Sequence, residues 1–340
     1  MQTPRHTIGD TIAQSGDDET AWLADAGETP CAVHPLVWLV ADRLGLGCTV
    51  AGGDAELRAG YGRGGGEGVR IDARWRDAPA AFWCDAAAWT EWISPVLPVT
   101  DAASVPEALR STLAAWTLAA PASLCDGTCL PHWPQGVHFD AADMPVETRI
   151  TFTLTWQGRR LTLHFLEADA SGLRECIDSM TPASGASFVP RLTCALAAGW
   201  SWLTPGQCDA VSIGQGVLLD EAADIAGGQC WCVYGRRAAL IQMQDVPGGI
   251  STDVLAVADA GSSPHGGTAV RIVATLAHVR MALPDVAAWT PGMPLEIPAV
   301  PAQLVTLWRD GAPWAIGRLA AFDDRLAVRV ENFVRSEVLA

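Results

Sequence analysis

The chain has 340 residues, an apolar fraction of 49% and a formal net charge of −16. Its length and apolar content predict two or three domains with hydrophobic cores. The acidity argues against a nucleic-acid-binding protein, because such proteins need a basic face to neutralise phosphates. The sequence contains no Lys, which excludes a Walker lysine, a Schiff-base lysine and any other catalytic lysine.

The N-terminal residues, MQTPRHTIGDTIAQSGDDETAWL, lack the apolar core and basic start of a signal peptide. We interpret residues 1–20 as a disordered acidic segment. No run of about eighteen apolar residues occurs, so we expect no membrane-inserted segment. A cytosolic location follows, and the ten cysteines are then expected to be reduced thiols and not a disulfide framework.

A domain of mixed α and β structure is predicted for residues 21–190. Apolar residues at helical spacing predict helices at 34–47, 79–93 and 104–120, and Ser104 with Glu107 has the pattern of a capping box. The glycine-rich run 61–68 is interpreted as a flexible connection between strands. No Lys-Ser or Lys-Thr follows it, and nothing marks it as a nucleotide-binding turn.

A β-hairpin is predicted at 149–165, after a proline-broken stretch at 121–145. Ile150, Phe152, Leu154 and Trp156 alternate with three threonines, and Gln157-Gly158-Arg159 provides the turn. One face of this hairpin should be buried and the other solvated. The hairpin and the helices together give an α+β domain.

Two groups of cysteines are candidates for chemistry. Cys125, Cys129, His132 and His138 have the residue types of a Cys2His2 zinc site. Their irregular spacing and two nearby prolines favour ordinary loop or buried thiols, so no metal is assigned and the question stays open. Cys230 and Cys232 lie on a predicted strand, where residues two apart share a face, and are expected in the core.

Residues 268–340 form a compact β unit. Strands with period-two alternation are predicted around residues 270–276, 304–308, 314–320 and 326–330, with turns at Asp310-Gly311 and Asp323-Asp324. A unit of this size buries too little apolar surface to be stable by itself, so we expect it to associate. It holds seven acidic and seven basic residues, and the excess negative charge lies upstream.

Residues 191–245 read as a degenerate earlier copy of this unit. RLTCALAAGWSWL parallels RIVATLAHVRMAL, SIGQGVLLD parallels WTPGMPLEI, and CWCVYGRRAALIQM parallels LVTLWRDGAPWAIGRL. Gly214 then corresponds to Gly292, and Gly235 to Gly311. Residues 246–267, rich in Gly, Ser and Pro, are interpreted as a flexible linker between the copies.

Catalytic motifs are missing. The run from Gly199 to Leu203 fails the nucleophile-elbow pattern, because Leu203 stands where a glycine is required. The seven histidines are scattered, and Asp323-Asp324 suits a hairpin tip better than a carboxylate pair. We therefore expect no enzyme activity and no cofactor.

The strand, the LPDVAAW turn, the TPGMPLEI corner, the LWRDGAPWAIGRL hairpin and the closing DDRLAVRVENF strand resemble the SPOA domain of flagellar FliM and FliN and of type III secretion SctQ proteins (YscQ, HrcQ, SpaO). The resemblance covers residues 268–340. Chain length and the tandem repeat favour the SctQ family over the shorter FliN. The expected fold class is an α+β N-terminal domain followed by two small all-β SPOA-type modules that exchange strands and form dimers.

This resemblance implies a non-catalytic scaffold of the cytoplasmic sorting platform, or C-ring, at the inner-membrane base of a type III protein secretion system. The implied partners are the stator SctL, the adaptor SctK, the ATPase SctN through SctL, export chaperone–effector complexes, and the chain's own C-terminal fragment or another SPOA domain. A flagellar switch protein of the FliM/FliN type is the alternative.

A CheC-like phosphatase is a further, weaker alternative, because the N-terminal regions of FliM-like proteins resemble CheC. That site needs a Glu followed three residues later by Asn on a helix. Asn332 is the only asparagine, and it falls in the last predicted strand.

Apolar residues of the C-terminal unit are expected to build its core and dimer seam. These are Leu276, Val279, Leu283, Trp289, Leu295, Leu307, Trp314, Ile316 and Val328.

Overall fold

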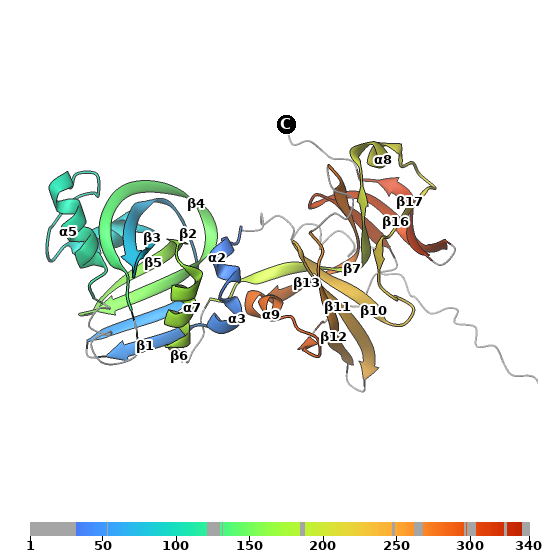
Figure 1. Cartoon of the computed structure of the whole chain (residues 1–340). Helices are drawn as coiled ribbons and strands as arrows, with labels where there is room; N and C mark the ends of the chain where they lie inside the picture. The colour runs from blue at the N-terminus through green and yellow to red at the C-terminus, as the bar shows by residue number, and fades with distance from the viewer. Residues whose placement is uncertain are drawn as a thin grey trace, which may run out of the picture.

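The computed structural model describes residues 32–52, 54–120, 130, 132–183, 188–246, 249–261, 268–295, 297, 304–322 and 325–334. The described chain is mostly β-sheet with a few short helices, and it forms two lobes (Figure 1). One lobe contains a six-stranded sheet and the other an eleven-stranded sheet. The predicted acidic segment 1–20 lies outside the described residues.

The first lobe is a curved sheet with the strand order β3-β5-β4-β2-β1-β6, in which β3 also pairs with β2. Because of that extra pairing, β2, β4, β5 and β3 close into a ring. The strands are β1 (Cys48–Gly52), β2 (Ala55–Trp75), β3 (Ala78–Asp85), β4 (Gln135–Trp156), β5 (Arg159–Glu167) and β6 (Thr181–Pro182). The helices are α2 (Pro35–Trp38), α3 (Ala41–Leu44), α4 (Ala86–Ile93), α5 (Glu107–Thr117) and α7 (Ala170–Asp178).

The predicted hairpin at 149–165 is confirmed as the β4–β5 pair. Thr153 pairs with Thr162, and the φ angles of Gln157 and Gly158 are +50° and +75°. Two positive φ angles match the twist of a two-residue hairpin turn. Ile150, Phe152 and Leu154 are buried, as their alternation predicts.

The glycine-rich run 61–68 is not a loop, contrary to the prediction. It lies inside β2, which pairs with β4 along nearly its whole length. A methyl group on Gly64 would overlap the His164 ring, and one on Gly68 would overlap Trp83. The glycines therefore allow rings from neighbouring strands to lie against the backbone of a curved strand. The same pairing makes the second half of the proline-broken stretch part of β4.

The helix predictions are corrected at three places. Residues 78–85 form β3, and the helix begins only after Asp85, whose carboxylate accepts a hydrogen bond from the Ala88 amide at 2.9 Å. The segment 34–47 divides into α2 and α3. Helix α5 has no side-chain cap, since the Ser104 hydroxyl donates instead to the Asp101 carbonyl, so the predicted capping box is wrong.

The core of the first lobe is aromatic. Phe82, Phe139, Phe152 and Phe165 are fully buried. Trp89 of α4 packs on Phe139 with a ring-centre distance of 4.5 Å, and its indole donates to the Thr117 hydroxyl at 3.1 Å. Trp89 thus holds α4 against both the sheet and α5.

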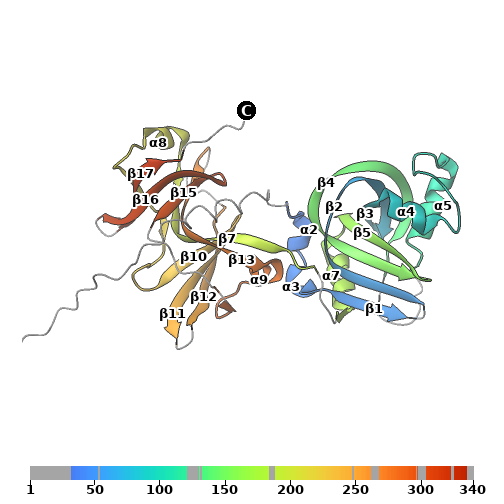
Figure 2. The same ribbon diagram turned by 180° about the vertical axis from the view of Figure 1, so that it is seen from behind.

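The second lobe consists of two halves with the same order of elements (Figure 2). Each half has a long strand, a short helix, a very short strand and three more strands. The first half contains β7 (Arg191–Leu203), α8 (Pro205–Ala210), β8 (Gly216–Leu218), β10 (Gln229–Tyr234), β11 (Arg237–Val246) and β12 (Gly249–Asp259), with β9 (Glu221–Ala222) as an addition. The second contains β13 (Val270–Ala282), α9 (Leu283–Ala287), β14 (Pro294–Leu295), β15 (Val305–Arg309), β16 (Ala312–Phe322) and β17 (Arg325–Phe333).

The halves are interlocked. The long strands β7 and β13 pair antiparallel at the centre of one continuous sheet. Strand β8 of the first half pairs with β17 of the second, and β14 of the second half pairs with β12 of the first. Each half therefore completes the outer edge of the other.

The predicted linker 246–267 is wrong, because it contains β12, which pairs with β11 over ten positions. Backbone pairing overrides the local Gly and Ser content. Segments 191–245 and 268–340 consequently share one sheet instead of forming separate modules. The aligned glycines occupy matching turns, with φ of +89° at Gly214 and +85° at Gly292. Gly235 and Gly311 are also both left-handed.

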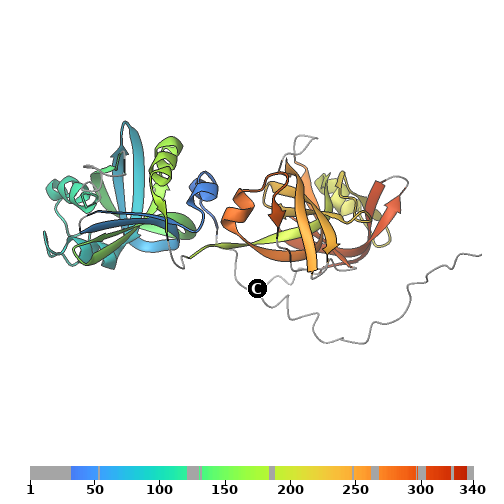
Figure 3. The same cartoon turned by 90° about the horizontal axis from the view of Figure 1, so that it is seen from below.

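The lobes meet through α2 and α3 on one side and α9 with the β10–β11 turn on the other (Figure 3). The ring centres of Trp38 in α2 and Tyr234 in β10 are 5.5 Å apart. A single large set of buried apolar residues continues from one lobe into the other.

Candidate functional site

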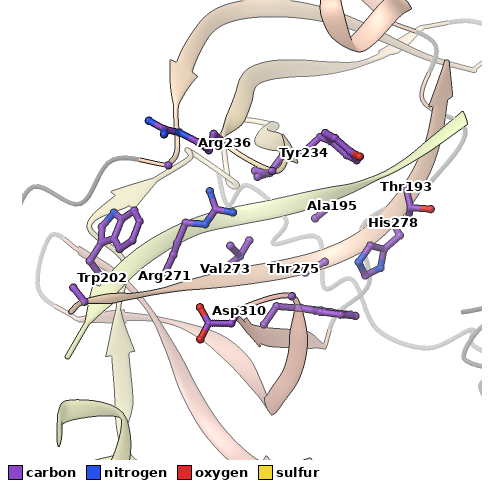
Figure 4. Close-up of a pocket in the computed structure, with 16 residues that line it drawn as sticks. Thr193, Ala195, Trp202, Tyr234, Arg236, Arg271, Val273, Thr275, His278 and Asp310 are labelled. Atoms are coloured by element: carbon purple, nitrogen blue, oxygen red, sulfur yellow. The ribbon is translucent and has the colours of Figure 1, made fainter. Parts of the chain in front are cut away.

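A groove crosses the centre of the second lobe (Figure 4). Its floor is the outer face of the paired strands β7 and β13, and its walls are the tips of the β10–β11 and β15–β16 hairpins. The volume is about 550 Å³. Both halves of the lobe contribute to it, so the groove exists only because the halves are joined.

The sheet beneath the groove carries a small apolar cluster that is separate from the main core. Trp200 of β7 and Trp231 of β10 pack edge to face, with ring centres 4.9 Å apart. Val273 of β13 and Trp308 of β15 belong to the same cluster and line the groove. The floor can therefore receive an apolar side chain.

Two polar atoms of the groove lining have no hydrogen-bond partner within the described structure. Thr275 is only 4% exposed, yet its Oγ1 is unpaired, and so is Nε1 of Trp308. A buried polar group without a partner costs free energy. These two atoms are suited to bind the polar groups of a segment placed in the groove.

An imidazole and a guanidinium complete the floor on β13. The His278 ring meets Trp308 edge to face, with ring centres 5.1 Å apart, and burial lowers the pKa of His278 below its ordinary value, which favours the neutral form. Arg271 donates to the Ala260 carbonyl, and burial lowers the pKa of its guanidinium. A half-buried cation of this kind favours an anionic ligand.

Basic residues extend beyond the groove along the same face. Arg280 of β13 and Arg191 of β7 are exposed, and the alternation of each strand places them on the side of His278 and Thr193. Arg236, on the other wall, is paired with Asp259 at 2.8 Å. Among the described residues that line the groove, Asp310 is the only acidic one. A peptide with both acidic and aromatic side chains fits this combination.

The nine predicted interface residues lie mainly inside the lobe. Leu276, Val279, Leu283, Trp289, Leu295, Leu307 and Val328 are buried, while Trp314 and Ile316 are half-buried. Several lie on strands that pair with the first half, since Val279 pairs with Cys194 and Val328 with Val217. Their role in a seam between two chains stays a prediction.

The structure describes half of the Cys–His group. Cys125 and Cys129 lie outside the described residues; His132 is exposed, and His138 contacts Asp140 at 3.1 Å. Within the described ranges, no cluster of His, Cys, Asp or Glu has the arrangement of a metal site. Cys230 and Cys232 are fully buried on β10, which confirms that prediction.

The groove itself was not foreseen from the sequence. Its residues come from β7, β10, β13 and β15, which are far apart along the chain. The sequence repeat could have indicated the groove. Its two copies supply the matching hairpins β10–β11 and β15–β16, which form the walls on either side of β7 and β13. Asn332 lies in β17, as predicted, and not on the helix that a CheC-type site requires.

None of the helices in the described part of the chain combines the length and the hydropathy needed to span a bilayer. A comparison with curated proteins found no match. The model of the SepQ protein N-terminal domain matches residues 35–176, and the model of the SepQ protein C-terminal domain matches residues 187–334. The chain therefore belongs to the SepQ family, the SctQ-type proteins of type III secretion.

Proposed function

We propose that the chain is a non-catalytic scaffold of the cytoplasmic sorting platform at the inner-membrane base of a type III secretion apparatus. The observation that carries this proposal is the interlocked second lobe, in which each half completes the sheet of the other. A lobe built in this way offers strand edges and a central groove for assembly. The family assignment supports a role in secretion.

In this proposal the two halves are SPOA modules. Within one chain, the halves exchange β8 and β14. A separate C-terminal fragment, or the SPOA domain of another protein, would make the same exchange between two chains. The nine predicted residues would then contribute to the seam, and those on β13 and β17, such as Val279 and Val328, lie where the second half meets the first. Dimerisation by strand exchange follows from the same contacts.

We assign the groove to the N-terminal segment of the stator SctL, through which the ATPase SctN would be held. The unpaired Thr275 and Trp308 atoms, the apolar floor and the Arg271 cation support a peptide ligand. The adaptor SctK and the export chaperone–effector complexes complete the proposed set of partners.

The test is a pull-down of the tagged full-length chain from its native cell. We expect the stator and the ATPase to be recovered with the wild-type chain and lost with Arg271→Glu. Arg318→Glu is the matched control, since Arg318 is exposed on β16 and should leave recovery unchanged. Recovery of flagellar rotor proteins instead would favour the switch-protein alternative. Unchanged recovery with Arg271→Glu would remove the groove from the proposal.

A further inference from the structure

The segment that precedes the first described residue is acidic and carries one large aromatic side chain. Residues 1–31 include six acidic residues, one Arg and Trp22. Four of the acids and Trp22 fall within residues 16–25, GDDETAWLAD. This stretch therefore combines the anionic and aromatic groups that suit the groove.

The described chain begins on the first lobe, a few residues before that lobe touches the second. The Ala32 carbonyl accepts a hydrogen bond from the Thr148 amide at 2.8 Å, which fixes the starting point on the first lobe. Six residues later, the Trp38 ring lies 5.5 Å from the ring of Tyr234. Tyr234 belongs to the hairpin that forms one groove wall. Its ring packs with the main core, on the face of the sheet opposite the groove residues Val233 and Val273, so the N-terminal segment starts beside the lobe that contains the groove.

The number of intervening residues limits how far Trp22 can lie from Ala32. Trp22 precedes Ala32 by ten positions, and an extended chain spans about 3.3 Å per residue, or roughly 33 Å over that interval. The groove is on the lobe that Trp38 touches but on the other face of its sheet, so the segment must pass an edge of that lobe to enter it.

The groove offers a partner for each part of the segment. Trp22 would pack on the floor between Val273 and Trp308, while the acidic run would lie toward Arg271, Arg280 and Arg191. These three cations contrast with a chain whose net charge is −16. Backbone groups of the segment would satisfy Oγ1 of Thr275 and Nε1 of Trp308.

We propose that residues 16–25 dock in the β7–β13 groove of the same chain and act as a built-in competitor for the peptide partner. The competition rests on the proposed function of the groove, whereas the docking itself does not. A partner then gains access only by displacing the segment. The partner's apparent association constant is its intrinsic value multiplied by the fraction of chains whose groove is open.

The docking is tested on the purified full-length chain without any partner. Trp22 is replaced by the photo-cross-linker p-benzoylphenylalanine, and the cross-linked peptides are identified by mass spectrometry. We expect cross-links to β13 and β15 around Val273 and Trp308. The same cross-linker at Gln2, outside the acidic stretch, is the matched control and should not label the groove. Cross-links from position 22 to the first lobe would overturn the proposal.

Charge reversal tests the electrostatic part. Asp17→Arg with Asp18→Arg, in the cross-linker chain, should lower the groove cross-linking yield about tenfold, because like charges would then face Arg271 and Arg280. These substitutions lie outside the described fold, and an unchanged melting temperature would show that the lobes are intact. An unaltered yield would contradict the proposed orientation.

A mixture of isotopically light and heavy chains separates docking within a chain from docking between chains. Cross-links of a single isotope support the proposal, and mixed ones overturn it. Because no stator protein is present, failure here leaves the pull-down result untouched. A failed pull-down likewise leaves the cross-linking result standing.

Discussion

Val217 of β8 pairs with Val328 of β17, although the two residues belong to different halves of the second lobe. Both are buried, and the Leu219 amide extends the contact by donating to the Leu326 carbonyl at 2.9 Å. The pair is therefore a place where the stability of one half depends on the other.

Val217→Asp should destabilise the whole second lobe. A carboxylate at this position would be buried without a partner, and we expect a loss of about 3 kcal/mol in the free energy of unfolding. Urea denaturation followed by circular dichroism measures the loss. Val96→Asp is the control, because Val96 is half-exposed and should cost little. If residues 270–333 kept their original midpoint in Val217→Asp, the halves would be independent.

The isolated fragment 268–340 should self-associate, because it lacks the partner strands β7 and β8. Sedimentation at micromolar concentrations should give a dimer. Trp314→Asp should weaken that dimer, since Trp314 is half-buried against Phe333 with ring centres 5.7 Å apart. The exposed Phe322 provides the control Phe322→Asp. A well-folded monomer would count against the interlocked-half interpretation.

Gly68→Ala should destabilise the first lobe by about 2 kcal/mol, because the added methyl group would overlap the Trp83 ring and the Cys84 carbonyl. Gly206→Ala is the matched control: Gly206 faces open space in α8, so its replacement should be neutral or slightly stabilising. Thermal unfolding compares the two variants. Equal melting temperatures would contradict close packing against the β2 backbone.

The first lobe should lose stability in acid because of His164. Burial and the Arg149 guanidinium lower the pKa of His164 to about 4 in the folded state, compared with an ordinary value of 6.5. The unfolded state then binds the proton more tightly. The free energy of unfolding is therefore not reduced by His164 above pH 6.5, and it decreases as the pH falls from there through about 4.

His164→Gln should flatten this pH dependence in chemical unfolding measured between pH 4 and 6.5. His132→Gln, at an exposed position, should leave it unchanged. Some slope should remain in His164→Gln, because burial also lowers the pKa values of His34 and His278. A pH profile identical to that of the wild type would show that His164 does not cause the loss of stability in acid.

The sequence predicts those hairpins whose two strands are adjacent along the chain and whose turn residues are characteristic. The Gln157-Gly158 turn and the alternation of Ile150, Phe152 and Leu154 gave the β4–β5 hairpin correctly. The Asp310-Gly311 turn did the same for β15 and β16. In both cases the strands are neighbours in sequence, so no distant residue was needed.

Elements decided by distant partners were missed. Phe82 fits helical spacing with Ala86 and Trp89, but it lies in β3 because that strand pairs with both β2 and β5. The Gly and Ser content around β12 suggested a linker, whereas β11 holds that stretch as a strand. The groove is formed by four strands that are far apart in the sequence. The repeated glycines Gly235 and Gly311, which lie at the turns of its two walls, were the sequence feature that indicated it.

The exchange of β8 and β14 also affects biosynthesis. While the ribosome is still translating the second half, β8 has no β17 to join and β12 lacks β14. The lobe can close only after residue 333 has left the exit tunnel. During that interval β8 and β12 are open to pairing with the same strands of another chain.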